Sequence, residues 1–218
     1  MGGINMVDIE AVKKEFTEIY KENITRDGAD KLLDYLTNKC DFFVAPASTR
    51  FHGSFEGGLA QHSINVYRCL KDYLERPRVK ELYKLSYTDE QIAIVSLLHD
   101  MCKIDCYKTE MRNVKNEQGK WESVPFYKFD DDLPYGHGEK SVYIITGFMR
   151  LSREEAFAIR SANALNGVLE VNEKLFVYDA YVRMGSAVDE CVHYAITTFD
   201  DNVTPSKYRV TVNKTDPN

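Results

Sequence analysis

The chain has 218 residues, which is enough for one domain with a sizeable core or at most two small ones. Apolar residues make up 44% and charged residues 28%, as in ordinary globular proteins. The formal net charge of -6 argues against broad binding to duplex nucleic acid, which needs a surface rich in Lys and Arg. It is compatible with a small phosphate-containing ligand held by a few local cations. No apolar run approaches the roughly 18 residues of a membrane span, so no membrane partner is expected.

The five cysteines are an odd number without the spacing of a disulfide framework. They are Cys40, Cys69, Cys102, Cys106 and Cys191. The first residues, Met1 to Met6, lack the basic and apolar regions of a signal peptide. We therefore expect free or buried thiols in a reducing cytoplasm. The sequence leaves open whether the chain forms a homo-oligomer.

Helical periodicity predicts the first elements. Apolar residues recur near helical spacing over about 7–22 and again over about 28–39. Residues 41–50 contain Pro46 and predict an ordered loop. A long helix is then expected over roughly 58–75, ending near Pro77.

The next helix begins at a capping box. Thr88 offers a side-chain acceptor and Gln91 follows at the position that completes the box. The run Ile92 to Leu98 is apolar on nearly every face, which is typical of a central, buried helix. This helix is predicted to end in His99 and Asp100. Two polar groups are thereby carried into or beside the core, where they need partners.

Residues of about 106–128 have a different pattern. Aromatic and β-branched residues flank a turn-rich segment, Asn116 to Lys120, which predicts a β-hairpin. Helices are expected again over about 137–150, 152–164 and 175–199, followed by a loose tail over about 200–218. The predicted fold class is therefore all-α, a helical bundle with a small inserted hairpin.

The strongest chemical signal comes from three polar residues with apolar neighbours. His62 belongs to one predicted buried helix face, and His99 with Asp100 ends another. Imidazoles and a carboxylate that converge from different helices could hold a metal ion with nitrogen and oxygen ligands. Such an ion polarises phosphoryl oxygens and activates water. From spacing alone, histidines satisfied within the core are the commoner explanation.

Several segments resemble a known family. Residues 42–47 and 52–63 resemble the entry to the HD domain of metal-dependent phosphohydrolases, in particular the branch related to bacterial 3′–5′ exoribonuclease HD domains. Leu97 to Lys103 is similar to the His-Asp signature of that superfamily, and Tyr135 to Ser141 to a further element of it. The resemblance covers about residues 40–200. It implies a single HD-type domain over 1–218, with helices 7–39 packed on that core.

The resemblance also implies roles for individual residues. His62, His99 and Asp100 would be metal ligands, and Asp100 would bridge two ions if two are bound. His137 would bind a second ion or contact the phosphate, so Asp100, His137 and Lys103 are the candidate catalytic residues. The candidate substrate-binding residues are Lys140, Arg160 and Tyr194. Both lysines could neutralise phosphate oxygens, although solvated helix ends are an equally good interpretation.

Two departures from the family pattern concern the end of the site. After Arg160 the family carries a His, whereas this chain has Ser161 to Ala164. The last helix of the family supplies an Asp ligand, and our placement puts Tyr194 there. Glu190, one turn earlier, is the candidate replacement ligand. If this placement shifts, the alternatives are Asp179, Asp189 and His193.

The function implied by the resemblance is a metal-dependent phosphohydrolase or phosphodiesterase acting on a nucleotide or short oligonucleotide. It would use one or two divalent ions, either Mg or a transition metal among Mn, Fe, Ni, Co and Zn. The alternative is a catalytically degenerate HD-fold protein that binds a nucleotide, such as a signalling nucleotide, without hydrolysing it. A third interpretation is an interaction module, in which His62 and His99 share no ligand. Cys102 and Cys106, which flank the site, are interpreted as packing residues.

Overall fold

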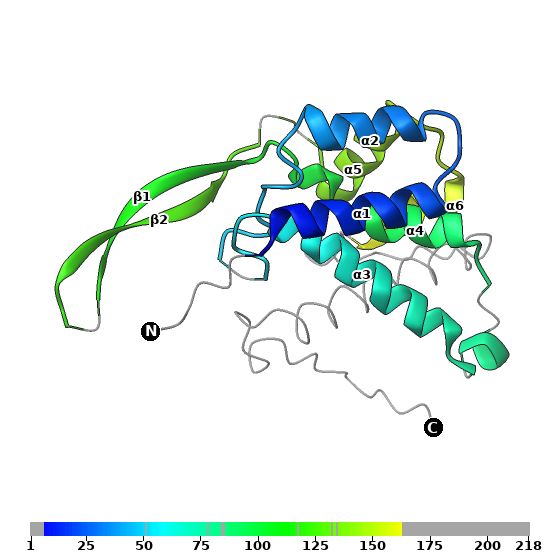
Figure 1. Ribbon diagram of the computed structural model, residues 1–218, viewed down its shortest axis with the longest axis horizontal. Helices are drawn as coiled ribbons and strands as arrows, with labels where there is room; N and C mark the ends of the chain where they lie inside the picture. Colours follow the sequence, from blue (N-terminus) through cyan, green and yellow to red (C-terminus); the bar gives the residue numbers. More distant parts are fainter. Residues whose placement is uncertain are drawn as a thin grey trace, which may run out of the picture.

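A computed structural model describes residues 7–162, apart from residues 51, 78, 84, 85, 117, 132 and 134. Figure 1 shows a body of packed helices from which a two-stranded hairpin projects. The long helices are α1 (Ile9–Asn23), α2 (Ala29–Asn38), α3 (Gly58–Glu75), α4 (Asp89–Leu97), α5 (His137–Thr146) and α6 (Arg153–Ala162). A π-helical turn η1 (Val79–Tyr83) follows α3, and a 3-10 turn η2 (Met101–Lys103) follows α4. The strands are β1 (Tyr107–Lys115) and β2 (Trp121–Phe129).

Helix α4 lies at the centre of the core. Every residue from Ile92 to Leu97 is buried, and the helix packs against α1, α3 and α6. Its start is the predicted capping box, because the Thr88 hydroxyl accepts from the Gln91 backbone N–H and the Gln91 side chain accepts from the Thr88 backbone N–H. The sequence therefore identified both the beginning and the burial of this helix.

The end of α4 differs from the prediction. The helix stops at Leu97, and His99 and Asp100 lie in the turn that joins it to η2. The imidazole Nδ1 of His99 lies 2.8 Å from the carbonyl oxygen of Ser96, one of the carbonyls that a helix end leaves without a backbone partner. The side chain thus completes the helix end instead of extending it.

The N-terminal helices pack on this core with their apolar faces. Helix α1 contacts α2, α3 and α4, and it buries Val12, Phe16 and Tyr20. Phe16 meets the rings of Phe42 and Phe43 at centroid distances of 4.9 and 5.4 Å. This aromatic cluster attaches the segment after α2 to α1. That segment leads directly into α3.

The all-α fold class is wrong, because the described chain contains both helices and an antiparallel sheet. Each strand has nine residues, and the register pairs Tyr107 with Phe129 and Lys115 with Trp121. The turn between them is stabilised by the Asn116 side chain, which accepts from the backbone N–H groups of Gln118 and Lys120. The hairpin lies where the sequence predicted one, but its two long strands form a sheet that makes the fold mixed rather than all-α.

The predicted helices over 137–150 and 152–164 correspond to α5 and α6, which pack against each other. The helix predicted over 175–199 and the tail over 200–218 lie outside the described residues. Among the described helices, none is both long and apolar enough to cross a membrane.

Candidate metal centre

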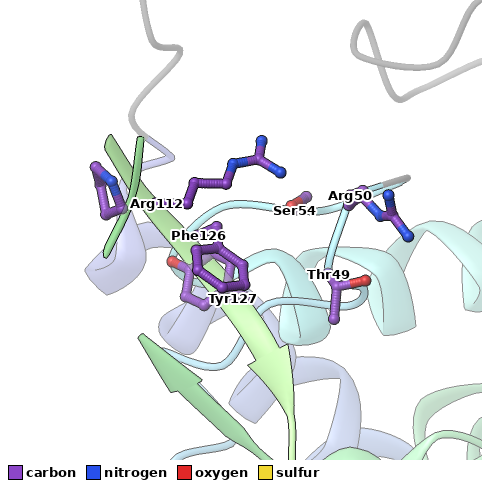
Figure 2. A pocket seen from close by; sticks show the side chains of 7 residues that line it. Thr49, Arg50, Ser54, Arg112, Phe126 and Tyr127 are labelled. Atoms are coloured by element: carbon purple, nitrogen blue, oxygen red, sulfur yellow. The ribbon is translucent and has the colours of Figure 1, made fainter. Parts of the chain in front are cut away.

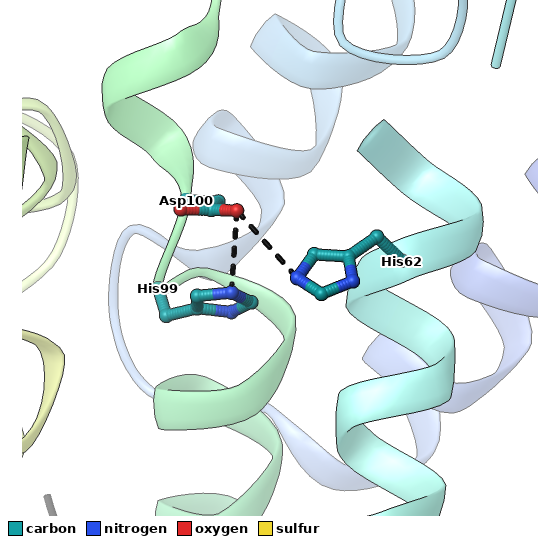
Figure 3. Close-up of side chains that lie close together, drawn as sticks. All are labelled: His62, His99 and Asp100. Atoms are coloured by element: carbon teal, nitrogen blue, oxygen red, sulfur yellow. Dashed lines mark ion pairs between the residues drawn. The ribbon is translucent and has the colours of Figure 1, made fainter. Parts of the chain in front are cut away.

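Three buried side chains converge between α3 and the turn after α4. One ligand atom from each of His62, His99 and Asp100 lies within 4.8 Å of the other two. The Asp100 Oδ2 atom is 3.3 Å from His99 Nε2 and 3.7 Å from His62 Nε2. Figure 3 shows both imidazoles directed toward this carboxylate from different backbone elements. The convergence that the sequence predicted for these three residues is therefore present.

Local structure fixes how each imidazole presents its nitrogen atoms. His62 lies on the buried face of α3, which packs against α4. His99 Nδ1 contacts the Ser96 carbonyl oxygen, which can only accept, so Nδ1 carries the proton. The lone pair of His99 is then on Nε2, the atom that faces Asp100. A metal-binding histidine is typically held by its second nitrogen in this way.

The electrostatics favour the protonation states that bind metal. The pKa of His62 is well below its usual value, because burial and the nearby His52 and His99 disfavour the imidazolium. Burial alone would raise the pKa of Asp100, but the adjacent Lys103 ammonium outweighs burial and holds it well below its usual value. A neutral imidazole and an ionised carboxylate are the forms that coordinate metal ions.

Lys103 is the nearest cation to the three residues. Its Nζ atom lies 2.7 Å from Asp100 Oδ2, the same oxygen that faces both histidines. The contact joins the two residues at either end of η2. A charge-assisted hydrogen bond of this length partly neutralises the carboxylate and orients it.

The donor set fits a divalent metal ion. His62 Nε2 is buried and has no hydrogen-bond partner among the described residues. A buried polar atom without a partner is costly, and a metal ion would satisfy it. Two imidazole nitrogens and one carboxylate oxygen form a donor set typical of Zn and other first-row transition metals. The buried group could therefore hold an ion.

Other predicted site residues have different partners. His137 is exposed at the start of α5, where its ring lies 5.6 Å from that of Phe129, and it is not among the three converging residues. Lys140 is buried and contacts Asp131 Oδ1 at 2.7 Å and Cys106 Sγ at 2.9 Å. Arg160 is paired with Glu139 at 2.6 Å. In this structure Lys140 and Arg160 are therefore paired with Asp131 and Glu139 rather than with the three converging residues.

Glu190 and Tyr194 lie outside the described residues, as do the alternatives Asp179, Asp189 and His193. Cys102 and Cys106 are both buried in the core. Burial raises the pKa of Cys102 to about 12, which keeps it protonated and agrees with a packing role.

His52 is a site residue that the sequence analysis did not identify. Its ring lies 4.8 Å from the ring of His62, which in turn lies 5.3 Å from the ring of His99. The signal was its position within the glycine-containing segment that precedes α3. Gly53 and Gly58 allow that segment to fold back, because a Cβ atom on Gly58 would lie 2.0 Å from the Gly53 carbonyl oxygen. This close approach brings His52 to the first turns of α3.

No protein-family model matches the chain, and no curated protein or solved structure was found to be similar to it. The resemblance to HD domains therefore rests on the sequence motifs alone.

Proposed function

We propose that this protein is an HD-type metal-dependent phosphohydrolase or phosphodiesterase whose substrate is a nucleotide or a short oligonucleotide. One observation carries the proposal, namely the buried convergence of His62, His99 and Asp100. Burial supports an ion-binding role, because imidazole and carboxylate groups are rarely brought together in a core without a shared partner. The resemblance of the surrounding motifs to HD domains supports the reaction class.

In this proposal the three side chains hold a divalent ion, which supplies charge stabilisation at a phosphoryl oxygen and activation of water. The Ser96 carbonyl keeps His99 in the tautomer that exposes Nε2. Lys103 keeps Asp100 ionised and oriented. Its ammonium group is also close enough to the centre to contact a phosphate oxygen of a bound substrate, as Lys commonly does.

Elemental analysis of the purified chain, combined with a screen for hydrolysis of nucleotides and oligonucleotides, tests the proposal. We expect stoichiometric divalent metal in the wild type and its loss in His99→Ala and Asp100→Asn, together with loss of hydrolysis. The control is Asp130→Asn, an exposed carboxylate paired with Lys108, which should keep both metal and activity. Circular dichroism should show unchanged helix content in all variants. Full activity in Asp100→Asn would contradict the mechanism.

A specific contact favours a second candidate, a protein that binds a nucleotide without hydrolysing it. The Lys103 ammonium contacts the same Asp100 oxygen that a bound ion would need. The positive charge of this ammonium could therefore replace that of a metal ion. The two candidates respond differently to Lys103→Met. A phosphohydrolase should keep its metal and lose most of its rate, whereas a metal-free binder should gain affinity for divalent ions when the competing ammonium is removed.

A further inference from the structure

A pocket of about 510 Å³ lies between the hairpin and the loop residues Thr49, Arg50 and Ser54. Figure 2 shows its side chains. Its polar lining consists of Thr49, Arg50, Ser54 and Arg112, and its aromatic lining of Phe126 and Tyr127 from β2. The pocket thus combines positive charge, hydroxyl groups and aromatic rings, which are the contacts that a ligand with a phosphate and a flat ring requires.

The two arginines are available to a ligand. Arg50 and Arg112 come from separate elements, and both are exposed. Neither forms an ion pair with any carboxylate in the part of the chain that the structure describes, whereas Arg68 pairs with Glu15 and Arg76 with Asp72. A guanidinium without a carboxylate partner presents a fork of N–H donors that matches the geometry of a phosphate.

The register of the hairpin explains how aromatic and cationic side chains meet. Glu110 pairs with Phe126 and Arg112 with Val124, so Arg112 and Phe126 share one face of the sheet. The Arg112 guanidinium lies 5.5 Å from the centre of the Phe126 ring. Tyr127 belongs to the opposite face, where its ring lies 6.4 Å from that of Tyr107. The free edge of β2 is therefore lined by rings on both sides, and aromatic rings stack on nucleobases of any sequence.

One short path connects the pocket to the candidate metal centre, and a second contact joins the hairpin to the same segment of the chain. His52 lies in the chain between Arg50 and Ser54, and its ring lies 4.8 Å from the ring of the candidate ligand His62. On the hairpin side, the Tyr107 hydroxyl donates to the Ala47 carbonyl at 3.3 Å. This contact holds the first strand of the hairpin against the segment that carries Arg50 and His52. The lining residues Arg50 and Ser54 thus flank His52 in the chain, and the ring of His52 lies next to that of the candidate ligand His62.

We propose that this pocket binds the nucleotide unit on which the metal centre acts. Arg50 and Arg112 contact a phosphate group, and Phe126 stacks on the base. The nucleotide unit is either a free nucleotide or the end of a short single strand. The proposal rests on the proposed function for the reaction that follows binding, but the binding itself does not depend on a metal ion.

The test measures binding of two probes to the full chain: AMP by titration calorimetry, and a short fluorescein-labelled oligoadenylate by fluorescence anisotropy. Arg112→Ala and Arg50→Ala should each weaken binding about tenfold, because each removes a charge-assisted hydrogen bond to phosphate. Phe126→Ala should weaken it by a similar factor through lost stacking. The matched control is Lys120→Ala, which removes the same charge from the exposed turn of the hairpin and should change affinity less than twofold.

Binding to an Asp100→Asn variant separates this inference from the proposed function. If both are right, that variant binds the probes normally and does not hydrolyse them, and the arginine variants raise KM more than they lower kcat. Arginine-dependent binding by a wild type without hydrolytic activity would support the pocket and contradict the enzyme. Binding of the oligoadenylate but not of AMP would identify a strand end as the ligand. Hydrolysis that is unaffected by both arginine variants, or binding of neither probe, would overturn the inference.

Discussion

Lys140 is a charged side chain that the fold buries almost completely, with 3% exposure. Its ammonium contacts Asp131 Oδ1 at 2.7 Å and Cys106 Sγ at 2.9 Å. Burial alone would lower the pKa of Lys140, but the contacts with Asp131 and Cys106 raise it, so the side chain stays charged. Asp131 is therefore needed as a counter-ion. The sequence alone shows only a Lys in a motif that resembles a family element. Its contact with Asp131 forms only in the folded chain, so it could not be predicted.

At the residue scale we predict that Asp131→Asn lowers the free energy of unfolding by about 3 kcal/mol at pH 7, since it leaves a buried ammonium without its counter-ion. Burial alone would raise the pKa of Asp131, but Lys140 and the Leu133 N–H lower it. Its stabilising contribution is thus present above the unfolded-state pKa of about 4 and is lost as the pH falls through the lower folded-state value. Urea unfolding at pH 7 and at pH 3 measures both effects.

The neighbouring residue supplies the control. Asp130 pairs with Lys108 on the exposed side of the hairpin, so Asp130→Asn should lower the free energy of unfolding far less than Asp131→Asn does. Equal losses in the two variants at pH 7 would show that Lys140 does not depend on Asp131.

At the scale of elements, the segment before α3 is held against the helix by close backbone contacts. The Gly53 carbonyl accepts from the Ala47 N–H at 2.8 Å, and the Leu59 N–H donates to the Ala45 carbonyl at 3.0 Å. No side chain fits between Gly53 and Gly58, where an added Cβ would lie 2.0 Å from a carbonyl oxygen. These contacts fix the position of His52 relative to His62.

We expect Gly58→Ala to lower the free energy of unfolding by about 2–3 kcal/mol, because the backbone must move to make room for the methyl group. The same movement should separate His52 from His62 and so weaken the binding of the metal ion and nucleotide that we propose. Gly119→Asn is the comparison, since Gly119 has a φ of +77°, nothing lies within 4 Å of its Cβ position, and Asn tolerates that backbone region. A thermal melt of Gly58→Ala that matches the wild type would refute the packing argument.

The elements themselves could be predicted well from the sequence, for a physical reason. Each of these features depends on residues that are close together in the sequence. They are the apolar faces of α1 and α3, the capping box of α4 and the turn of the hairpin. The end of α4 was missed because a side chain, His99, replaces the next backbone contact. The role of His52 was missed because it depends on two glycines that allow a close approach, which no periodicity reveals.

At the scale of the whole molecule, Arg26 connects three parts of the chain. It lies between α1 and α2, and its guanidinium donates to both carboxylate oxygens of Glu155 at 2.8 Å. It also contacts Glu90 Oε2 at 3.1 Å and the Arg150 carbonyl at 2.9 Å. Glu90 is in the first turn of α4, and Glu155 is in the first turn of α6. One side chain therefore joins the N-terminal helices to the central helix and to the last described one.

Glu155 makes this connection costly to break. Its side chain is 1% exposed. In addition to Arg26, the carboxylate accepts a hydrogen bond from the Ser152 backbone N–H at 2.7 Å. The backbone N–H of Glu155 in turn donates to the Ser152 hydroxyl. This reciprocal pair is a capping box at the start of α6. The carboxylate therefore cannot move to solvent without also releasing the helix end.

We predict that Arg26→Ala lowers the free energy of unfolding by about 3–5 kcal/mol, because a buried carboxylate loses its bidentate partner. Arg26→Lys should recover only part of this loss, since an ammonium cannot satisfy both oxygens of Glu155 in the same geometry. Arg68→Ala, which breaks the exposed pair with Glu15, should cost less than about 1 kcal/mol. Adding Glu155→Gln to Arg26→Ala should restore stability relative to the single variant, because the unpaired charge is removed. Urea unfolding of all four variants at pH 7 measures these differences, and a loss in Arg26→Ala no larger than that in Arg68→Ala would mean that α6 does not depend on this connection.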